Sequence, residues 1–221
     1  MKLLAIDTAT FQASVAICDG NHILAEVERV VTTHSDVLLE LVDEAFSKAG
    51  LEIGDMEAVV CGKGPGSFTG VRIGLATAKG LCLAASKRLV CVPSLLALGS
   101  AVAEQNEEDL LAAALLDARR GEVYYALYRS GQRIQAEQAM TPEAVISDLN
   151  RGERVLLVGD GALKYQDRLL GGILGAKLAP EDCHQIHARY LLKDAEKRIV
   201  EGCEDALNDA EPLYVRGPDI R

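Results

Sequence analysis

The sequence has an excess of acidic over basic residues and lacks long apolar runs. Asp and Glu number 33 against 23 Lys and Arg, which gives a formal charge of -10 and a pI of about 4.9. Such a surface repels phosphate backbones, so we expect another chain to make most of the contacts with any nucleic acid. No stretch approaches the ~18 uninterrupted apolar residues of a membrane span. The opening MKLLAIDTAT places Asp7 where a signal peptide needs an apolar core, so we expect a cytoplasmic protein with no membrane contact.

Paired metal-binding or disulfide-forming residues are also missing. The six cysteines are scattered, mostly inside apolar runs, and none makes a Cys-x-x-Cys pair; they are Cys18, Cys61, Cys82, Cys91, Cys183 and Cys203. We expect them to be reduced and buried. His184 and His187 are spaced by three residues in an expected loop, where the pattern favours a surface or capping role.

What the chain does contain is enough apolar material for a core. Hydrophobic residues make up 49% of the sequence and charged residues 25%, which is typical of globular proteins. A length of 221 residues suits two small lobes. The polar stretch 104–109 is the expected boundary, dividing the chain into 1–105 and 106–221.

The two halves show the same order of expected elements. The first half reads as three short strands (KLLAIDTAT, ASVAICDG, HILAEVERVV), a helix at 35–49, a strand at 58–62 and a helix at 69–86. The second half reads as LLAAALLDA, EVYYALYRSG and an edge strand near RIQAEQ, then a helix beginning at Thr141, a buried strand in RVLLVGDGA and a late helix at 188–201. Each half begins with a β-meander and continues with alternating helices and strands. This pattern predicts a duplicated α/β lobe.

The stretch GKGPGSFTGVRIG, residues 62–74, is glycine-rich and opens the second helix. It lacks the lysine of a Walker loop, and in both frames it lacks the last glycine of the dinucleotide pattern. Two alternatives remain. Free backbone N–H groups at the helix start, with Arg72, could hold an anion. Alternatively, the small residues could let another helix approach closely, because they recur every four residues in two rows, Gly70, Gly74 and Ala78, and Ala76, Gly80 and Ala84.

Both first-half helices carry more apolar surface than one core-facing stripe needs. In the first helix these residues include Val37, Leu38, Leu41, Val42 and Ala45. In the second, Arg72 and Lys79 are the charged residues between Gly70 and Ser86. The surplus indicates either a partner protein or coverage by the second lobe of the same chain, and the pattern alone does not decide between them.

Five motifs, in this order and spacing, carry a resemblance to a known family. IDTAT, GPGSFTGVRIG, LLDARRGEVY, LVGDGA and PLYVR resemble the bacterial TsaB family, also called YeaZ, over residues 3 to about 217. The resemblance implies the two-lobed α/β fold of actin, sugar kinases and Hsp70-like ATPases, with a reduced second lobe.

The resemblance implies a non-catalytic subunit. It would bind and activate a TsaD-like catalytic subunit and work with a TsaE-like ATPase to place threonylcarbamoyl on N6 of the adenosine next to the anticodon of tRNAs reading ANN codons. The group would come from threonylcarbamoyl-adenylate. ATP and a metal ion would belong to the partner subunits, this chain would hold no cofactor tightly, and tRNA would be reached through the complex.

The family's helix bundle maps to the helices at 35–49 and 69–86. The implied interface consists of Val37, Leu38, Leu41, Val42, Ala45, Gly70, Val71, Gly74, Leu75 and Ala78. The same helices could form a homodimer. We therefore predict that Gly74→Leu abolishes the complex and leaves the monomer folded.

The sequence indicates no catalytic residue and no metal site. The catalytic paralogue binds its metal with two histidines four residues apart, whereas here His34 is followed by Leu38 at that spacing. Asp7 and Asp117 follow the first strand of each lobe, where related kinases bind Mg and phosphate, but the glycine-rich turn expected after each is missing. We expect a weak remnant of a nucleotide site there. The alternative hypotheses are an ATP-dependent phosphotransferase of the sugar-kinase class and a metallopeptidase.

Overall fold

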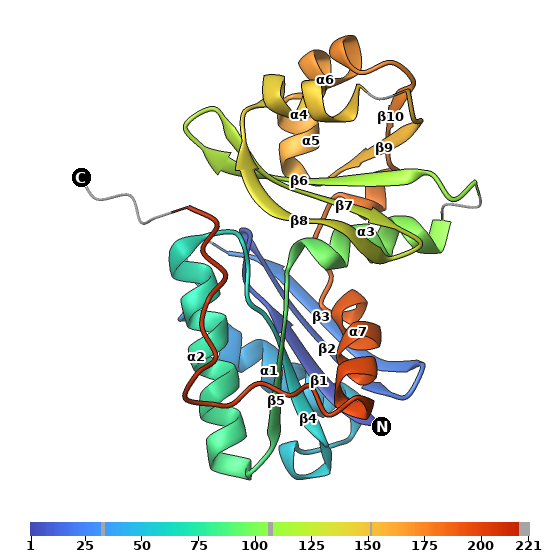
Figure 1. Ribbon diagram of the computed structural model, residues 1–221. Helices are drawn as coiled ribbons and strands as arrows, with labels where there is room; N and C mark the ends of the chain where they lie inside the picture. Colours follow the sequence, from blue (N-terminus) through green and yellow to red (C-terminus); the bar gives the residue numbers. More distant parts are fainter. Residues whose placement is uncertain (32–33, 106–107, 151, 217–221) are drawn as a thin grey trace. The chain divides into compact units, whose positions relative to one another are not determined.

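The structure, a computed structural model, describes residues 1–31, 34–105, 108–150 and 152–216 (Figure 1). It contains two compact units. Unit 1 consists of Met1–Ser94 and His187–Leu213, and unit 2 of Leu95–Ile186 and the chain from Tyr214 on. This division differs from the boundary drawn at 105/106, because a helix at 95–105 belongs to unit 2 and the last helix returns to unit 1.

Unit 1 is built on a five-stranded sheet in the order β3-β2-β1-β4-β5. The strands are β1 (Lys2–Asp7), β2 (Gln12–Asp19), β3 (His22–Val30), β4 (Ala58–Gly62) and β5 (Arg88–Val92). The first three are antiparallel neighbours, and β4 and β5 continue the sheet in parallel with β1. Gly20, with φ 57°, makes the tight turn from β2 to β3, as the Asp-Gly-Asn sequence predicts.

Helices cover both faces of this sheet (Figure 1). They are α1 (Leu38–Ala49) and α2 (Phe68–Ala85) on one face and α7 (Arg189–Val200) on the other, with a short 3-10 helix, η1 (Ile53–Asp55), after α1. The expected first helix begins later than 35, with Val37 as its N-cap. In the sequence, Thr33 and Asp36 have the spacing of a weak capping box, but Thr33 lies outside the described residues. The apolar residues of α1 and α2 pack with the sheet into one core cluster.

Helix α2 is long and apolar. By length and composition it would suffice to span a membrane, and 33% of its residues are buried. One such helix among the described residues is weak evidence for a membrane, because helices in the cores of soluble proteins and signal sequences meet the same criteria. Most of its surface faces away from the core of unit 1.

Unit 2 repeats the plan with the strand order β10-β9-β6-β7-β8. Its strands are β6 (Leu111–Arg119), β7 (Glu122–Arg129), β8 (Gln132–Met140), β9 (Val155–Val158) and β10 (Ala176–Leu178). Its helices are α3 (Leu95–Gln105), α4 (Pro142–Leu149), α5 (Asp160–Lys164), α6 (Gln166–Gly172) and the 3-10 helix η2 (Glu181–Cys183). Thr141 caps α4 by accepting the Ala144 N–H at 3.3 Å, which confirms the predicted helix start.

The two sheets confirm the predicted duplication. In each unit an antiparallel meander of three strands is followed by two more strands. The first of these pairs in parallel with the first strand of the meander, and the second pairs in parallel with the first of the two. Asp7, the last residue of β1, and Asp117, two residues before the end of β6, therefore hold similar places in the two units.

Candidate functional site

Asp7 is the last residue of β1 and is 1% exposed. Its Oδ1 accepts the backbone N–H of Ala9 at 2.8 Å, and Oδ2 is buried without a hydrogen bond of normal geometry. Gly62 ends the neighbouring strand β4, and a Cβ at this position would lie 1.8 Å from Asp7 Oδ2. The carboxyl group therefore fills a space that only glycine leaves open.

Burial raises the pKa of Asp7 to about 6, although the Ser94 hydroxyl and the Ala9 N–H lower it. The Ser94 hydroxyl also accepts the backbone N–H of Gly64 at 3.0 Å. A carboxylate that works as a Mg²⁺ ligand needs to be ionised and accessible. Asp7 is 1% exposed, so it fails the second condition, and its raised pKa makes ionisation more costly than for an ordinary aspartate.

The glycine-rich loop packs against the chain that follows β1. Ser67 donates its backbone N–H to Ala9 O at 2.7 Å, and its side chain accepts the Gly70 N–H at 3.2 Å. A Cβ at Gly66 would lie 2.3 Å from Ala9 O, and one at Gly70 would lie 2.2 Å from the backbone oxygen of Thr8. These N–H groups and glycines hold two backbones together, so the packing explanation of the loop is favoured over an anion cradle.

Asp117 also forms its interactions with residues of its own unit. Its Oδ2 pairs with Lys164 Nζ at 2.8 Å, and its Oδ1 accepts the Arg119 N–H at 3.0 Å. The Asp117 N–H in turn donates to Asp160 Oδ1 at 2.9 Å. The turn after β6 is made by Arg119 and Arg120, both with positive φ.

The residues predicted to meet a partner lie mostly in the core of unit 1. Nine of the ten are buried: Leu38, Leu41, Val42, Ala45, Gly70, Val71, Gly74, Leu75 and Ala78. Val37 is partly buried and packs against the same core. The residues predicted for the interface are therefore on the face of each helix that packs against the sheet. Because they are buried in unit 1, they are not accessible to a partner protein.

Gly74 illustrates the correction. A Cβ at Gly74 would lie 2.3 Å from Thr8 Oγ1, which donates to Gly70 O at 2.8 Å. The predicted outcome for Gly74→Leu, a folded monomer that loses its partner, is therefore withdrawn, because the leucine would collide within the monomer. The row of Gly70, Gly74 and Ala78 brings α2 close to the end of β1.

The second row of small residues is on the outside of α2. Ala76, Gly80 and Ala84 are exposed, and a Cβ at Gly80 would meet nothing within 4 Å. Leu83, beside them, is 76% exposed. The outer face of α1 is different, because acidic residues such as Glu40 and Asp43 surround its exposed Leu39. The surplus apolar surface thus belongs to α2.

One histidine, His184, differs from its expected surface role. His184 is buried, and its ring contacts Gly159 and Ala179 O, with the Gly159 N–H donating to Nδ1 at 3.1 Å. The expected surface role is therefore wrong for His184. Burial lowers the pKa of His34, whose Nε2 is buried without a hydrogen-bond partner.

Comparison with known proteins identifies the family. Residues 27–164 match the family model described as TsaD, tRNA N6-adenosine threonylcarbamoyltransferase. The tRNA threonylcarbamoyladenosine biosynthesis protein TsaB of Escherichia coli is 34% identical over 98% of this chain and 95% of its own length. The chain belongs to the TsaB/YeaZ family. A TsaB protein of Haemophilus influenzae, 29% identical, covers 98% of this chain and 94% of its own length.

Solved structures agree with the TsaB/YeaZ assignment. YeaZ from Pseudomonas aeruginosa has a TM-score of 0.81 at 29% identity, covering 96% of this chain and 99% of that one. A second P. aeruginosa structure, described as similar to peptidase YEAZ, has a TM-score of 0.82 over 97% and 99% of the two chains. Component A of the (R)-2-hydroxyglutaryl-CoA dehydratase of Acidaminococcus fermentans, 13% identical with a TM-score of 0.55 over 89% and 99%, shares the fold alone. The predicted actin-like ATPase fold is confirmed.

Proposed function

We propose that this chain acts in the biosynthesis of tRNA threonylcarbamoyladenosine as a non-catalytic subunit that binds and activates a TsaD-like catalytic subunit in the cytoplasm. The pathway follows from the TsaB relatives. A TsaE-like ATPase completes the complex, which reaches the adenosine next to the anticodon. ATP and the catalytic metal belong to the partners, and the acidic surface of this chain favours tRNA contact through them.

The outer face of α2 is the surface that we propose for binding the partner. The apolar Leu83 lies next to the exposed row of Ala76, Gly80 and Ala84. A row of small side chains lets another helix approach closely, and a large apolar side chain beside it supplies buried area. This face replaces the buried residues predicted from the sequence. A homodimer through the same face would compete with the catalytic partner.

The environments of the two aspartates support a role without catalysis. Asp7 is buried with a raised pKa, and Asp117 is held by Lys164 and Arg119. A phosphotransferase would need these carboxylates to reach Mg²⁺ and phosphate, so the geometry does not favour that alternative. A metallopeptidase is not proposed either, because Leu38 stands where the metal motif of the catalytic paralogue has its second histidine.

The test is the mass of the chain by light scattering on a sizing column, alone and with its cognate TsaD-like subunit. We expect a 1:1 complex that Leu83→Glu abolishes, because a carboxylate would be buried without a partner. The matched control is Leu174→Glu, which changes an 82% exposed leucine of unit 2. A complex that survives Leu83→Glu at unchanged affinity would refute the α2 interface. If the unmodified chain forms no complex at micromolar concentrations, the subunit role itself is wrong.

A further inference from the structure

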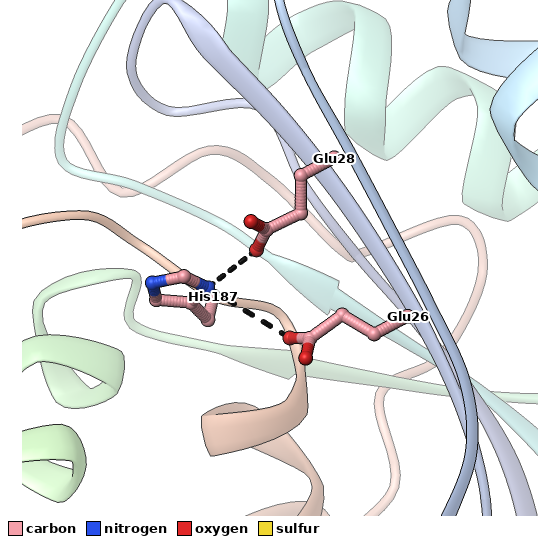
Figure 2. Close-up of side chains that lie close together, drawn as sticks. All are labelled: Glu26, Glu28 and His187. Carbon is pink, nitrogen blue, oxygen red and sulfur yellow. Dashed lines mark hydrogen bonds and ion pairs between the residues drawn. The ribbon is translucent and has the colours of Figure 1, made fainter. Parts of the chain in front are cut away.

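Three side chains that the proposed function does not use meet on the α7 face of unit 1. Glu26 and Glu28 are two residues apart on β3, so both project from the same side of the strand. His187 arrives from the segment that leads into α7. In Figure 2 the imidazole faces both carboxylates, and dashed lines join it to each of them. Its Nδ1 lies 2.5 Å from Glu28 Oε1 and 3.8 Å from Glu26 Oε1.

The strand register creates room for this cluster. On β2, the buried Ala16 is directly opposite Glu26, and Ser14 is opposite Glu28. Ser14 donates its hydroxyl to Glu28 Oε1 at 3.2 Å and accepts the Ala188 N–H at 2.8 Å. The segment before α7 is thereby fixed against the sheet next to the cluster.

Glu26 is positioned by only one of its oxygens. Arg189 donates to Glu26 Oε2 at 2.9 Å, and the Arg189 guanidinium also lies over the Tyr190 ring. The other oxygen, Oε1, is buried, has no hydrogen-bond partner and faces His187. A buried carboxylate oxygen without a partner is costly, and an ion or a water commonly satisfies such an atom. With a neutral imidazole, two ionised carboxylates and one guanidinium leave a charge of -1, which one bound cation would offset.

The three ligand atoms have suitable spacing for a transition metal. They all lie within 4.8 Å of one another. Two ligands of a tetrahedral zinc ion, each at ~2.1 Å, are ~3.4 Å apart. This value lies between the two observed separations from His187 Nδ1, 2.5 and 3.8 Å. Small rotations of the two glutamate side chains would equalise them.

We propose that Glu26, Glu28 and His187 form a site for one divalent transition-metal ion of the zinc type. One imidazole and two carboxylates are ligands that zinc accepts. Arg189 and Ser14 would orient the two carboxylates through their hydrogen bonds to Glu26 Oε2 and Glu28 Oε1. The ion joins β3 to the entry of α7, so it stabilises the folded unit and has no catalytic role. This goes beyond the proposed function and departs from the sequence-based expectation of no metal in this chain.

A proton is the competing occupant. The Glu28 hydrogen bond raises the pKa of His187, so a protonated imidazole could balance the charge without any metal. In that case the cluster is an ion-pair network only. Zinc binding distinguishes the two cases. A metal site binds one zinc ion per chain and loses affinity when Glu28 or His187 is replaced, whereas an ion-pair network does not.

The experiment is a calorimetric titration of the full chain with Zn²⁺, repeated with cobalt(II) to record its visible spectrum. Cys203→Ser serves as the background, because Cys203 is the exposed thiol. We expect one ion per chain, a rise in Tm with zinc, and a cobalt spectrum without thiolate charge transfer. Glu28→Gln and His187→Ala should each weaken binding more than tenfold. The control, His22→Ala, changes an exposed histidine of the same strand and should leave binding unchanged.

Three results would overturn the site. They are no zinc binding at about a hundred micromolar, equal binding by the Glu28→Gln variant, and a thiolate band in the cobalt spectrum. Glu28→Gln preserves the shape of the side chain, so it remains informative if His187→Ala unfolds the chain. Complex formation with the TsaD-like subunit is measured separately, so failure of the metal site leaves that proposal untouched.

Discussion

Replacing Asp7 with asparagine should make unit 1 more stable at neutral pH. The carboxyl group has an ordinary pKa of 3.8 and one of about 6 in the folded chain, with burial as the main cause. At about 1.36 kcal/mol per pKa unit, the difference corresponds to ~3 kcal/mol. Asparagine keeps the acceptor for the Ala9 N–H and can donate to the Ser94 hydroxyl, so it loses no hydrogen bond that Asp7 makes.

The sign of the pH dependence follows from proton binding. The folded chain holds the Asp7 proton more tightly than the unfolded chain does, so the free energy of unfolding falls as the pH rises from about 4 to about 6. Above about pH 6, Asp7 is ionised in the folded chain, and the free energy of unfolding is lowered by the full cost of burying its charge. Asp7→Asn removes this contribution, so the variant should exceed the unmodified chain by up to ~3 kcal/mol at pH 7 and by little at pH 4.

The assay is urea unfolding followed by circular dichroism at both pH values. Because the chain has two units, hydrogen exchange at the β1 amides reports unit 1 separately. Asp43→Asn, at an exposed position of α1, is the control and should change neither value. An equal effect of Asp7→Asn at both pH values, or a loss of stability at pH 7, would refute the argument that burial of the charge is the cost.

Other substitutions test the packing of single residues, each by urea unfolding. Gly74→Ala should cost ~1–3 kcal/mol because its Cβ meets Thr8 Oγ1, whereas Gly80→Ala, on the open face of the same helix, should gain up to ~1 kcal/mol; equal effects would contradict the assigned faces. Ser86→Gly should gain about 1 kcal/mol, because Ser86 ends α2 with a left-handed φ of 54°, and a destabilised variant would argue against that backbone conformation. His184→Ala should lose more than ~2 kcal/mol, because the Gly159 N–H would be buried without an acceptor; a neutral result would mean that water replaces the ring.

The order of elements was predictable because each depends on local signals. Alternating apolar residues, the turn at Gly20 and the cap at Thr141 act over a few residues, and together they gave the duplicated meander and its helices. The place of the aspartates at the ends of β1 and β6 followed from the same reasoning. The last helix was found correctly, but its return to unit 1 depends on contacts between distant parts of the chain.

The faces of the helices could not be predicted in the same way. Two rows of small residues on α2 look alike in the sequence, and only the position of Thr8 shows that the row with Gly74 faces inward. The wide apolar face of α1 is likewise explained by its packing in the core of unit 1, and it does not indicate a partner. The cluster at Glu26 and Glu28 was missed because His187 is 159 residues from Glu28, although alternating glutamates on an expected strand are a signal that both share a face.

The return of α7 to unit 1 has a consequence for how the chain is made on the ribosome. Unit 2 is encoded within unit 1, between Ser94 and His187, so the sheet of unit 1 emerges long before the helix that covers its second face. Asp205, which hydrogen-bonds the backbone of β5 at Leu89 and Cys91, emerges later still. During synthesis the apolar face of β1 and β4 that α7 covers therefore stays exposed while more than a hundred further residues are added, and such transiently exposed surface is prone to aggregation until α7 has emerged.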